Sequence, residues 1–282
     1  MKVGLNLLLW AGTITEEHVP VIEKLAELGY DGVELPIFGY DPAGCEKLRR
    51  HLDRLRLGCT LTTCVPPEAN PIAEEPEIRK AAVRYMKNVV EIAGILGSPI
   101  VAGPFTAPVG QLVGRRRTEG EWKRAVEVMQ QAAAEAEKAG IKLALEALNR
   151  FETYFINTIA DAVKFAREVA SPAFGIMFDT FHANIEEEDF QSAVKQGGSH
   201  IIHVHVSENH RGTPGSGHVP FDRVFGALKS IGYDNWLTIE AFGGSVPEVA
   251  AATCIWRDIF RDNFELAEQG LRFVRETWSR AG

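Results

Sequence analysis

Short apolar runs alternate with longer amphipathic stretches along the whole chain, and this alternation limits the fold more than any other feature. The runs are rich in Val, Ile, Leu and Phe without strict polar alternation, which is typical of parallel strands covered on both faces. We therefore expect eight strands, at residues 3–9, 32–35, 59–65, 100–102, 142–146, 174–178, 201–206 and 236–240.

The stretches between these runs have the pattern of helices. The clearest are residues 16–28, 77–96, 119–139, 158–169 and 221–230. Glycine follows three of them directly, at Gly29, Gly97 and Gly140. Because glycine readily adopts the left-handed conformation that ends a helix, these positions are expected helix ends.

Eight strand–helix alternations without a linker or a change in composition predict one domain over residues 1–282, folded as a single (β/α)8 TIM barrel. Such barrels typically take about 250 residues. A doubly wound sheet is the alternative. It usually carries a glycine-rich phosphate loop after its first strand, and the segment GLNLLLWAGT contains none.

Charge and cysteine content narrow the classes of function. The net charge of -8 argues against a nucleic-acid partner, and the short run Arg115, Arg116 and Arg117 is expected to be a solvated loop. Because no segment approaches about 18 consecutive apolar residues, we expect a soluble protein without a membrane partner. Four cysteines without a CxxC pair suggest a reducing, cytoplasmic setting.

Four consecutive expected strands carry a polar residue at or beside their C-terminal end. These residues are Glu146, Asp179, His205 and Glu240. In (β/α)8 barrels the site lies at the C-terminal ends of the strands, so the four side chains should meet at one rim. A single carboxylate in such a place is often only a helix cap, but four on successive strand ends point to a shared role.

A divalent cation would explain why three carboxylates converge on a dry barrel mouth, where they would otherwise repel one another. Three carboxylates and one imidazole suit Mn²⁺, Mg²⁺ or Co²⁺, whereas a structural zinc site more typically includes cysteine. His203 should point to the same face as His205, one layer lower, and we assign it a structural role.

Further polar and aromatic residues follow the strand ends. Glu152, His182 and Arg211 are candidates for substrate contacts or for interactions that stabilise the loops. Trp10, Phe105 and Phe242 are candidates for an apolar pocket wall, with ordinary core packing as the alternative.

Several segments together resemble the ketose 3-epimerase family, which includes D-tagatose and D-psicose (allulose) 3-epimerases and belongs to a wider group of xylose isomerase-like barrels. The resemblance is strongest over residues 146–258. It is carried by EALNRFE (146–152), FDTFHANIEEED (178–189), HVHVSENHRGTPGSGHVP (203–220), TIEAF (238–242) and IWRD (255–258).

The resemblance implies that one Mn²⁺ or similar ion is held by the four strand-end residues, and that Glu146 and Glu240 also act as the acid/base pair. It implies that Glu152, His182 and Arg211 bind a ketose, and that the protein is a homodimer or homotetramer. Inverting C3 means removing a proton beside the C2 carbonyl on one face and returning one on the other, which two carboxylates can do.

Two departures from the family pattern leave the sugar open. VSENHR stands where the family often has a GES-type sequence, and AGPFTAPVG lacks an expected tryptophan. An aldose–ketose or hydroxypyruvate-type isomerase and a lyase subunit for 3-oxo-glycosides therefore remain alternatives. An endonuclease IV-like enzyme is disfavoured, because it would need several metals and a basic groove. A non-catalytic sugar-binding barrel is also disfavoured, because it would not need both carboxylates.

Overall fold

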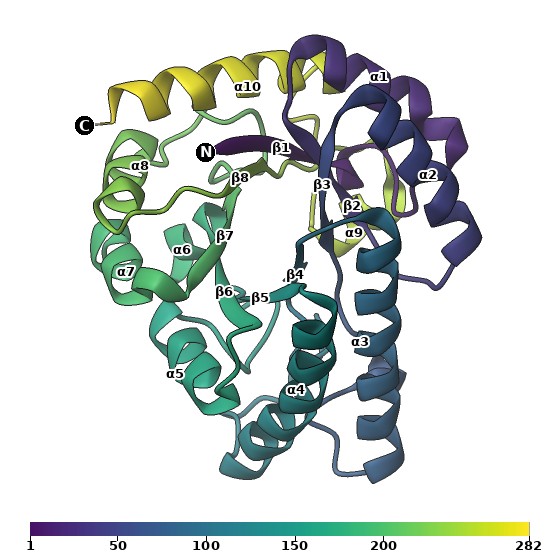
Figure 1. Cartoon of the computed structure of the whole chain (residues 1–282). Helices are drawn as coiled ribbons and strands as arrows, with labels where there is room; N and C mark the ends of the chain where they lie inside the picture. Colours follow the sequence, from purple (N-terminus) through teal and green to yellow (C-terminus); the bar gives the residue numbers. More distant parts are fainter. Residues whose placement is uncertain (282) are drawn as a thin grey trace.

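The computed structural model describes residues 1–281, in which eight parallel strands close into a barrel in the order of the sequence (Figure 1). This confirms the predicted (β/α)8 architecture. The strands are β1 (Lys2–Asn6), β2 (Gly32–Pro36), β3 (Gly58–Thr62), β4 (Ile100–Gly103), β5 (Lys142–Glu146), β6 (Phe174–Asp179), β7 (Ile201–Val206) and β8 (Trp236–Ile239).

Helices surround the barrel and cover its outer face (Figure 1). The α-helices of residues 1–281 are α1 (Val19–Leu28), α2 (Pro42–Leu55), α3 (Pro76–Leu96), α4 (Glu119–Ala139), α5 (Ile159–Val169), α6 (Thr180–Glu186), α7 (Phe190–Gly197), α8 (Phe221–Ser230), α9 (Pro247–Ala252) and α10 (Asn263–Arg280). The expected ends at Gly29, Gly97 and Gly140 are confirmed, since each glycine has a left-handed backbone. Over residues 1–281, no helix has both the length and the apolar character needed to cross a membrane.

Several predicted boundaries are wrong. The first strand ends at Asn6 because its side chain accepts a hydrogen bond from the Leu8 N–H at 2.9 Å, which starts a short 3-10 helix over Leu7–Leu9. The third strand ends at Thr62 rather than at residue 65. The first helix begins as a 3-10 turn over Glu16–His18. Helices α2, α6, α7, α9 and α10 are absent from the predicted set.

The floor of the barrel is apolar. A buried cluster fills it, formed by Ile100, Ala102, Ala144, Met177 and Trp236. The Trp236 ring occupies space that two glycines leave open, because a Cβ atom would lie 2.6 Å from the ring at Gly32 and 2.9 Å at Gly58. Along each strand, residues two positions apart share a face. The residues two positions beyond Ala144 and Met177 therefore point into the barrel mouth.

A register shift between β6 and β7 aligns two of the predicted site residues. Ile176 pairs with Ile201, but the next residue, Met177, pairs with His203, so β7 carries one extra residue at this point. Such irregularities redirect side chains. As a result Asp179 and His205 are direct partners across the two strands.

Candidate active site

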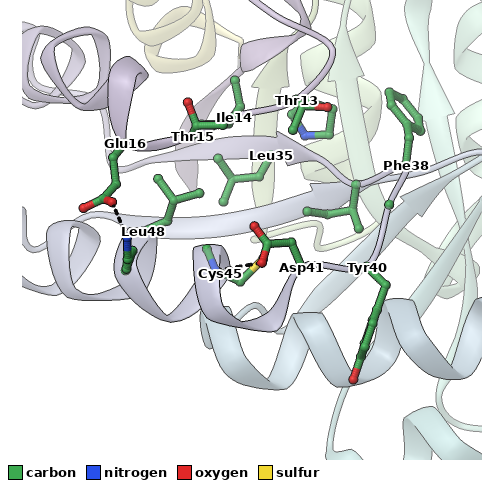
Figure 2. A pocket seen from close by; sticks show the side chains of 15 residues that line it. Thr13, Ile14, Thr15, Glu16, Leu35, Phe38, Tyr40, Asp41, Cys45 and Leu48 are labelled. Atoms are coloured by element: carbon green, nitrogen blue, oxygen red, sulfur yellow. Dashed lines mark hydrogen bonds and ion pairs between the residues drawn. The ribbon is translucent and has the colours of Figure 1, made fainter.

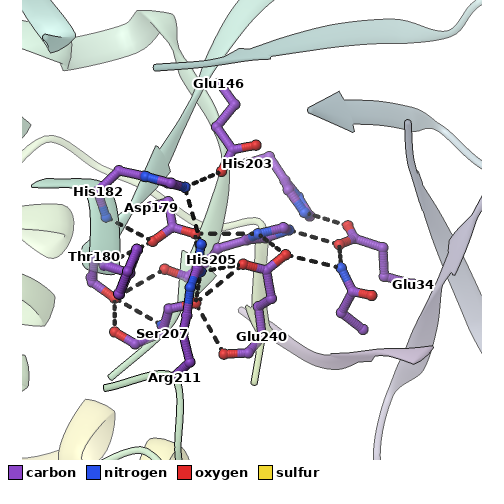
Figure 3. A network of polar contacts seen from close by, with 12 residues as sticks. Glu34, Glu146, Asp179, Thr180, His182, His203, His205, Ser207, Arg211 and Glu240 are labelled. Atoms are coloured by element: carbon purple, nitrogen blue, oxygen red, sulfur yellow. Dashed lines mark hydrogen bonds and ion pairs between the residues drawn. The ribbon is translucent and has the colours of Figure 1, made fainter. Parts of the chain in front are cut away.

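The four predicted strand-end residues meet inside the barrel mouth (Figure 3). Glu146 ends β5, Asp179 ends β6, His205 lies in β7 and Glu240 directly follows β8. All four are buried. His205 Nδ1 lies 3.6 Å from Asp179 Oδ2 and 3.3 Å from Glu240 Oε1.

Asp179 joins two groups of potential ligands. One ligand atom each from Asp179, His205 and Glu240 lies within 4.8 Å of the other two, and the same holds for Glu146, Asp179 and His182. The structure thus gathers the four predicted residues into one cluster and adds His182 beside Glu146, with His182 Nε2 3.4 Å from Glu146 Oε1.

Two atoms of this cluster have no hydrogen-bond partner among the described residues. They are Asp179 Oδ2 and His205 Nδ1, both fully buried. Leaving buried polar atoms unpaired is costly. A cation between them would satisfy both, and carboxylate oxygens with one imidazole nitrogen are a donor set that suits Mn²⁺, Co²⁺ or Mg²⁺. The residues therefore fit a divalent metal.

The surroundings shift the pKa values of Glu146 and Glu240 in opposite directions. Burial, together with the nearby charges of Asp179 and Glu240, raises the pKa of Glu146 well above its ordinary value. Burial acts in the same direction on Glu240, but the charges of His205 and Arg211 outweigh it and lower the pKa of Glu240. The two carboxylates thus have different electrostatic surroundings, which is common in acid/base pairs.

Both ring nitrogens of His182 have polar neighbours in the site. The backbone N–H of Asn149 donates to His182 Nδ1 at 3.0 Å, and His182 Nε2 lies 3.4 Å from Glu146 Oε1 and 3.2 Å from Arg211 Nη2. Burial lowers the pKa of His182 to about 3, which keeps the ring neutral. The Asn149 side chain also donates to Glu152 Oε1 at 2.7 Å, which brings Glu152 to the same side of the cluster.

Arg211 closes the other side of the cluster. Its Nη1 donates to Glu240 Oε2 at 2.6 Å and lies 3.5 Å from Asp179 Oδ2. The guanidinium packs over the ring of Phe181, 3.6 Å from its centroid, and 4.9 Å from that of Phe242. All three predicted substrate residues therefore lie around the cluster.

The three aromatic candidates for a pocket wall have different surroundings. Phe242 contacts Arg211 at the site. Trp10 is partly buried and packs against Phe264 of α10. Phe105 is fully buried and packs edge-on against Phe174, in the core between the barrel and its helices. Phe105 thus lies in the core, because it is fully buried and belongs to the main hydrophobic cluster.

A cavity of about 450 Å³ opens beside the cluster, lined by Phe181, Arg211 and the segment after α9 that includes Trp256. A separate cavity of about 300 Å³ lies at the end of β2 and against α2 (Figure 2). None of the cluster residues lines this second cavity. Its Asp41 caps α2 and its Lys47 pairs with Glu16, so their charges are already used in the fold.

Glu34 is a site residue that the sequence analysis missed. It lies within β2, is fully buried, and contacts both His203 and His205 (Figure 3). The available signal was a carboxylate between Val33 and Leu35 in an otherwise apolar strand, where an unpaired charge would be costly. The expected placement of His203 one layer below the metal candidates agrees with its pairing opposite Met177.

The fold and the site together indicate the class of enzyme to which the chain belongs. The chain belongs to the xylose isomerase-like TIM barrel family, whose model matches residues 22–277. A probable ketose 3-epimerase of Synechocystis sp. is 30% identical over 278 residues, which are 99% of this chain and 97% of the relative. Within the wider family, the chain thus belongs to the ketose 3-epimerases, which are enzymes of the isomerase class.

Two solved structures are similar over nearly the whole chain. An L-ribulose 3-epimerase gives a TM-score of 0.94 at 28% identity and covers 99% of this chain and 95% of its own. A D-psicose 3-epimerase from Clostridium cellulolyticum H10, solved with D-tagatose, gives a TM-score of 0.91 at 30% identity, and the match covers 99% of both chains.

Proposed function

We propose that this protein inverts C3 of a free ketose of the D-allulose/D-fructose, D-tagatose or L-ribulose type, with Glu146 and Glu240 as the acid/base pair. The observation that carries the proposal is geometric: two buried carboxylates, Glu146 at the end of β5 and Glu240 directly after β8, meet around Asp179 in one cluster. The names of the relatives support the same reaction on the same class of sugar.

In this proposal Glu146, Asp179, His205 and Glu240 hold one divalent ion, with Mn²⁺ favoured and Co²⁺ or Mg²⁺ as alternatives. When bound, the ion would supply positive charge that polarises neighbouring substrate oxygens. The unpaired Asp179 Oδ2 and His205 Nδ1 support this assignment.

The carboxylates carry out the proton transfers. The hydrogen on C3 is acidic because it is next to the C2 carbonyl, and one glutamate removes it to leave an enediolate. The other glutamate delivers a proton to the opposite face of C3, so that one proton is taken up and one is returned. In the reverse reaction Glu146 and Glu240 exchange these roles.

The neighbouring residues orient the sugar. Arg211 offers a fork of donors, and His182 offers a ring nitrogen, Nε2, next to Glu146. Glu152, joined to His182 through Asn149, would accept from a sugar hydroxyl. We further propose a homodimer or homotetramer in the cytoplasm, for which the free cysteines Cys45, Cys59, Cys64 and Cys254 are consistent with a reducing setting.

The first test is incubation of the Mn²⁺-loaded protein with D-fructose, D-allulose, D-tagatose and L-ribulose in D₂O, followed by NMR. We expect deuterium at C3 together with the C3 epimer. Deuterium at C1 with formation of an aldose would instead indicate an isomerase. Absence of exchange with all four sugars would overturn the proposal and favour a modified sugar such as a 3-oxo-glycoside.

Two variants test whether both glutamates are required. Glu146→Gln and Glu240→Gln keep the side-chain shape but cannot exchange a proton, so each should lower kcat by about 100-fold or more. Glu121→Gln is a matched control, because Glu121 is a buried carboxylate in α4 that pairs with Arg115. It should leave kcat unchanged. A kcat for either site variant within threefold of the wild type would contradict the assignment.

A further inference from the structure

Glu34 is surrounded by hydrogen-bond donors on both of its carboxylate oxygens. Asn6 Nδ2 and His205 Nε2 lie 3.0 and 2.7 Å from Oε1. Thr60 Oγ1 and His203 Nε2 lie 2.8 and 2.7 Å from Oε2. An ionised carboxylate has about four acceptor positions, and here all of them are used.

The strand register explains how these donors converge. Asn6 in β1, Glu34 in β2 and Thr60 in β3 are direct partners in neighbouring strands. The two histidines reach the same carboxylate from β7, across the interior of the barrel (Figure 3). The orientation of the Asn6 amide is defined independently, because its Oδ1 accepts from the Leu8 N–H, which leaves Nδ2 to face Glu34.

The contact with Glu34 defines the form of His205. Because an ionised carboxylate only accepts, the ring nitrogen facing it, Nε2, must carry a hydrogen. The other nitrogen, Nδ1, then faces Asp179 and Glu240 and has no hydrogen-bond partner among the described residues. Metal-binding histidines commonly donate their second N–H to a carboxylate in this way.

Glu34 also reaches Glu240. The Nδ2 of Asn6 lies 3.0 Å from Glu34 Oε1 and 3.3 Å from Glu240 Oε1, so the amide bridges the two carboxylates. One side chain from β2 thus contacts a residue from β7 directly and one that follows β8 through a single amide.

We propose that Glu34 is a positioning residue that holds His205 with its hydrogen on Nε2 and its Nδ1 lone pair directed at Asp179 and Glu240. This inference rests on the proposed function, since it assumes that Nδ1 binds the metal. Glu34, His203 and His205 do not form a second metal site themselves. Their N–O separations of 2.7 Å are hydrogen-bond lengths, and Asn6 and Thr60 occupy the remaining acceptor positions.

The direct test is NMR of the ring nitrogens in ¹⁵N-histidine-labelled protein loaded with diamagnetic Zn²⁺, with His205 assigned by comparison with His205→Asn. The expected result is a hydrogen on Nε2 and none on Nδ1. A hydrogen on Nδ1 in the metal-bound wild type would overturn the inference. This measurement needs no change at Glu34 and so does not depend on how a variant folds.

Metal affinity provides the second readout. Glu34→Gln removes the charge from the carboxylate, and Mn²⁺ affinity, measured from the EPR signal of free Mn²⁺, should fall by about 10- to 100-fold. Glu121→Gln is the control, because Glu121 is a buried carboxylate that bonds to Arg115 and Tyr154 and to none of the cluster residues, so it should change stability but not affinity. An affinity of Glu34→Gln within twofold of the wild type would contradict the inference.

The two proposals fail in different ways. If the wild-type protein binds neither Mn²⁺ nor Zn²⁺, the proposed metal site is wrong. If the wild type binds metal and epimerises a ketose, but the affinity of Glu34→Gln is unchanged, then only the positioning role of Glu34 is wrong.

Discussion

At the scale of the residue, Arg211 shows how tightly the site is held together. Its guanidinium is buried, donates to Glu240 and packs over Phe181. Its backbone has a φ of 64°, in the left-handed region, which costs a non-glycine residue about 1–3 kcal/mol. The hydrogen bond from the Arg211 N–H to the Glu208 carbonyl and its side-chain contacts offset that cost.

Replacing Arg211 should reveal the charge balance of the site. Arg211→Met removes the cation beside Glu240, and loss of one partner of a buried ion pair costs about 3–5 kcal/mol. We expect a loss of this size in the free energy of unfolding, measured with urea in EDTA, and a smaller loss with Mn²⁺, which supplies positive charge to the same carboxylate. Equal losses in both conditions would mean that no metal reaches Glu240.

At the scale of the element, the strands must both close the barrel and leave room inside it. Gly32 and Gly58 start β2 and β3, and both face the large ring of Trp236 at the floor. A Cβ atom at Gly32 would also lie 2.3 Å from the Gly58 carbonyl oxygen, which is backbone and cannot easily move. Small residues on these strands therefore allow one large side chain from β8 to fill the floor.

This packing predicts opposite effects for two identical substitutions. Gly32→Ala should lower the free energy of unfolding by about 1–3 kcal/mol through overpacking. Gly94→Ala is the control, because Gly94 is an exposed position of α3 with open space around it. It should raise stability by about 0.5–1 kcal/mol, the usual gain from alanine in a helix. Urea unfolding measures both, and a neutral Gly32→Ala would contradict the packing argument.

At the scale of the whole molecule, closure of the barrel concentrates charge. Strands β5 to β8 deliver three carboxylates and an imidazole to one rim, and β2 reaches the same histidine from across the barrel. The folded state creates this arrangement and the unfolded chain does not contain it. Metal binding should therefore be coupled to stability.

The coupling is measurable as a shift in Tm. Mn²⁺ at about 100 times its Kd should stabilise the native state by about 2.7 kcal/mol, which corresponds to a rise in Tm of about 5 °C for a chain of this size. Calorimetry in EDTA and in Mn²⁺, Co²⁺ or Mg²⁺ compares the ions. Asp179→Asn should abolish the shift. If the Tm of the wild type is the same with and without each ion, the proposed metal site is contradicted.

The sequence by itself was enough to predict the barrel and the gathering of Glu146, Asp179, His205 and Glu240. The physical reason is that parallel strands in a closed barrel end at the same rim, so residues at successive strand ends are neighbours whatever the details of packing. The helix ends at Gly29, Gly97 and Gly140 were also predictable from sequence, because the left-handed backbone at a helix end depends on local sterics.

Other features depend on contacts between residues far apart in the chain, and only the tertiary structure decided them. Glu34 lies inside a strand, and its donors come from β1, β3 and β7, which become neighbours only when the barrel closes. The extra residue in β7 that aligns His205 with Asp179 is a matter of register between strands. Local sequence specifies which residues end each strand, whereas register and closure determine which of their atoms meet.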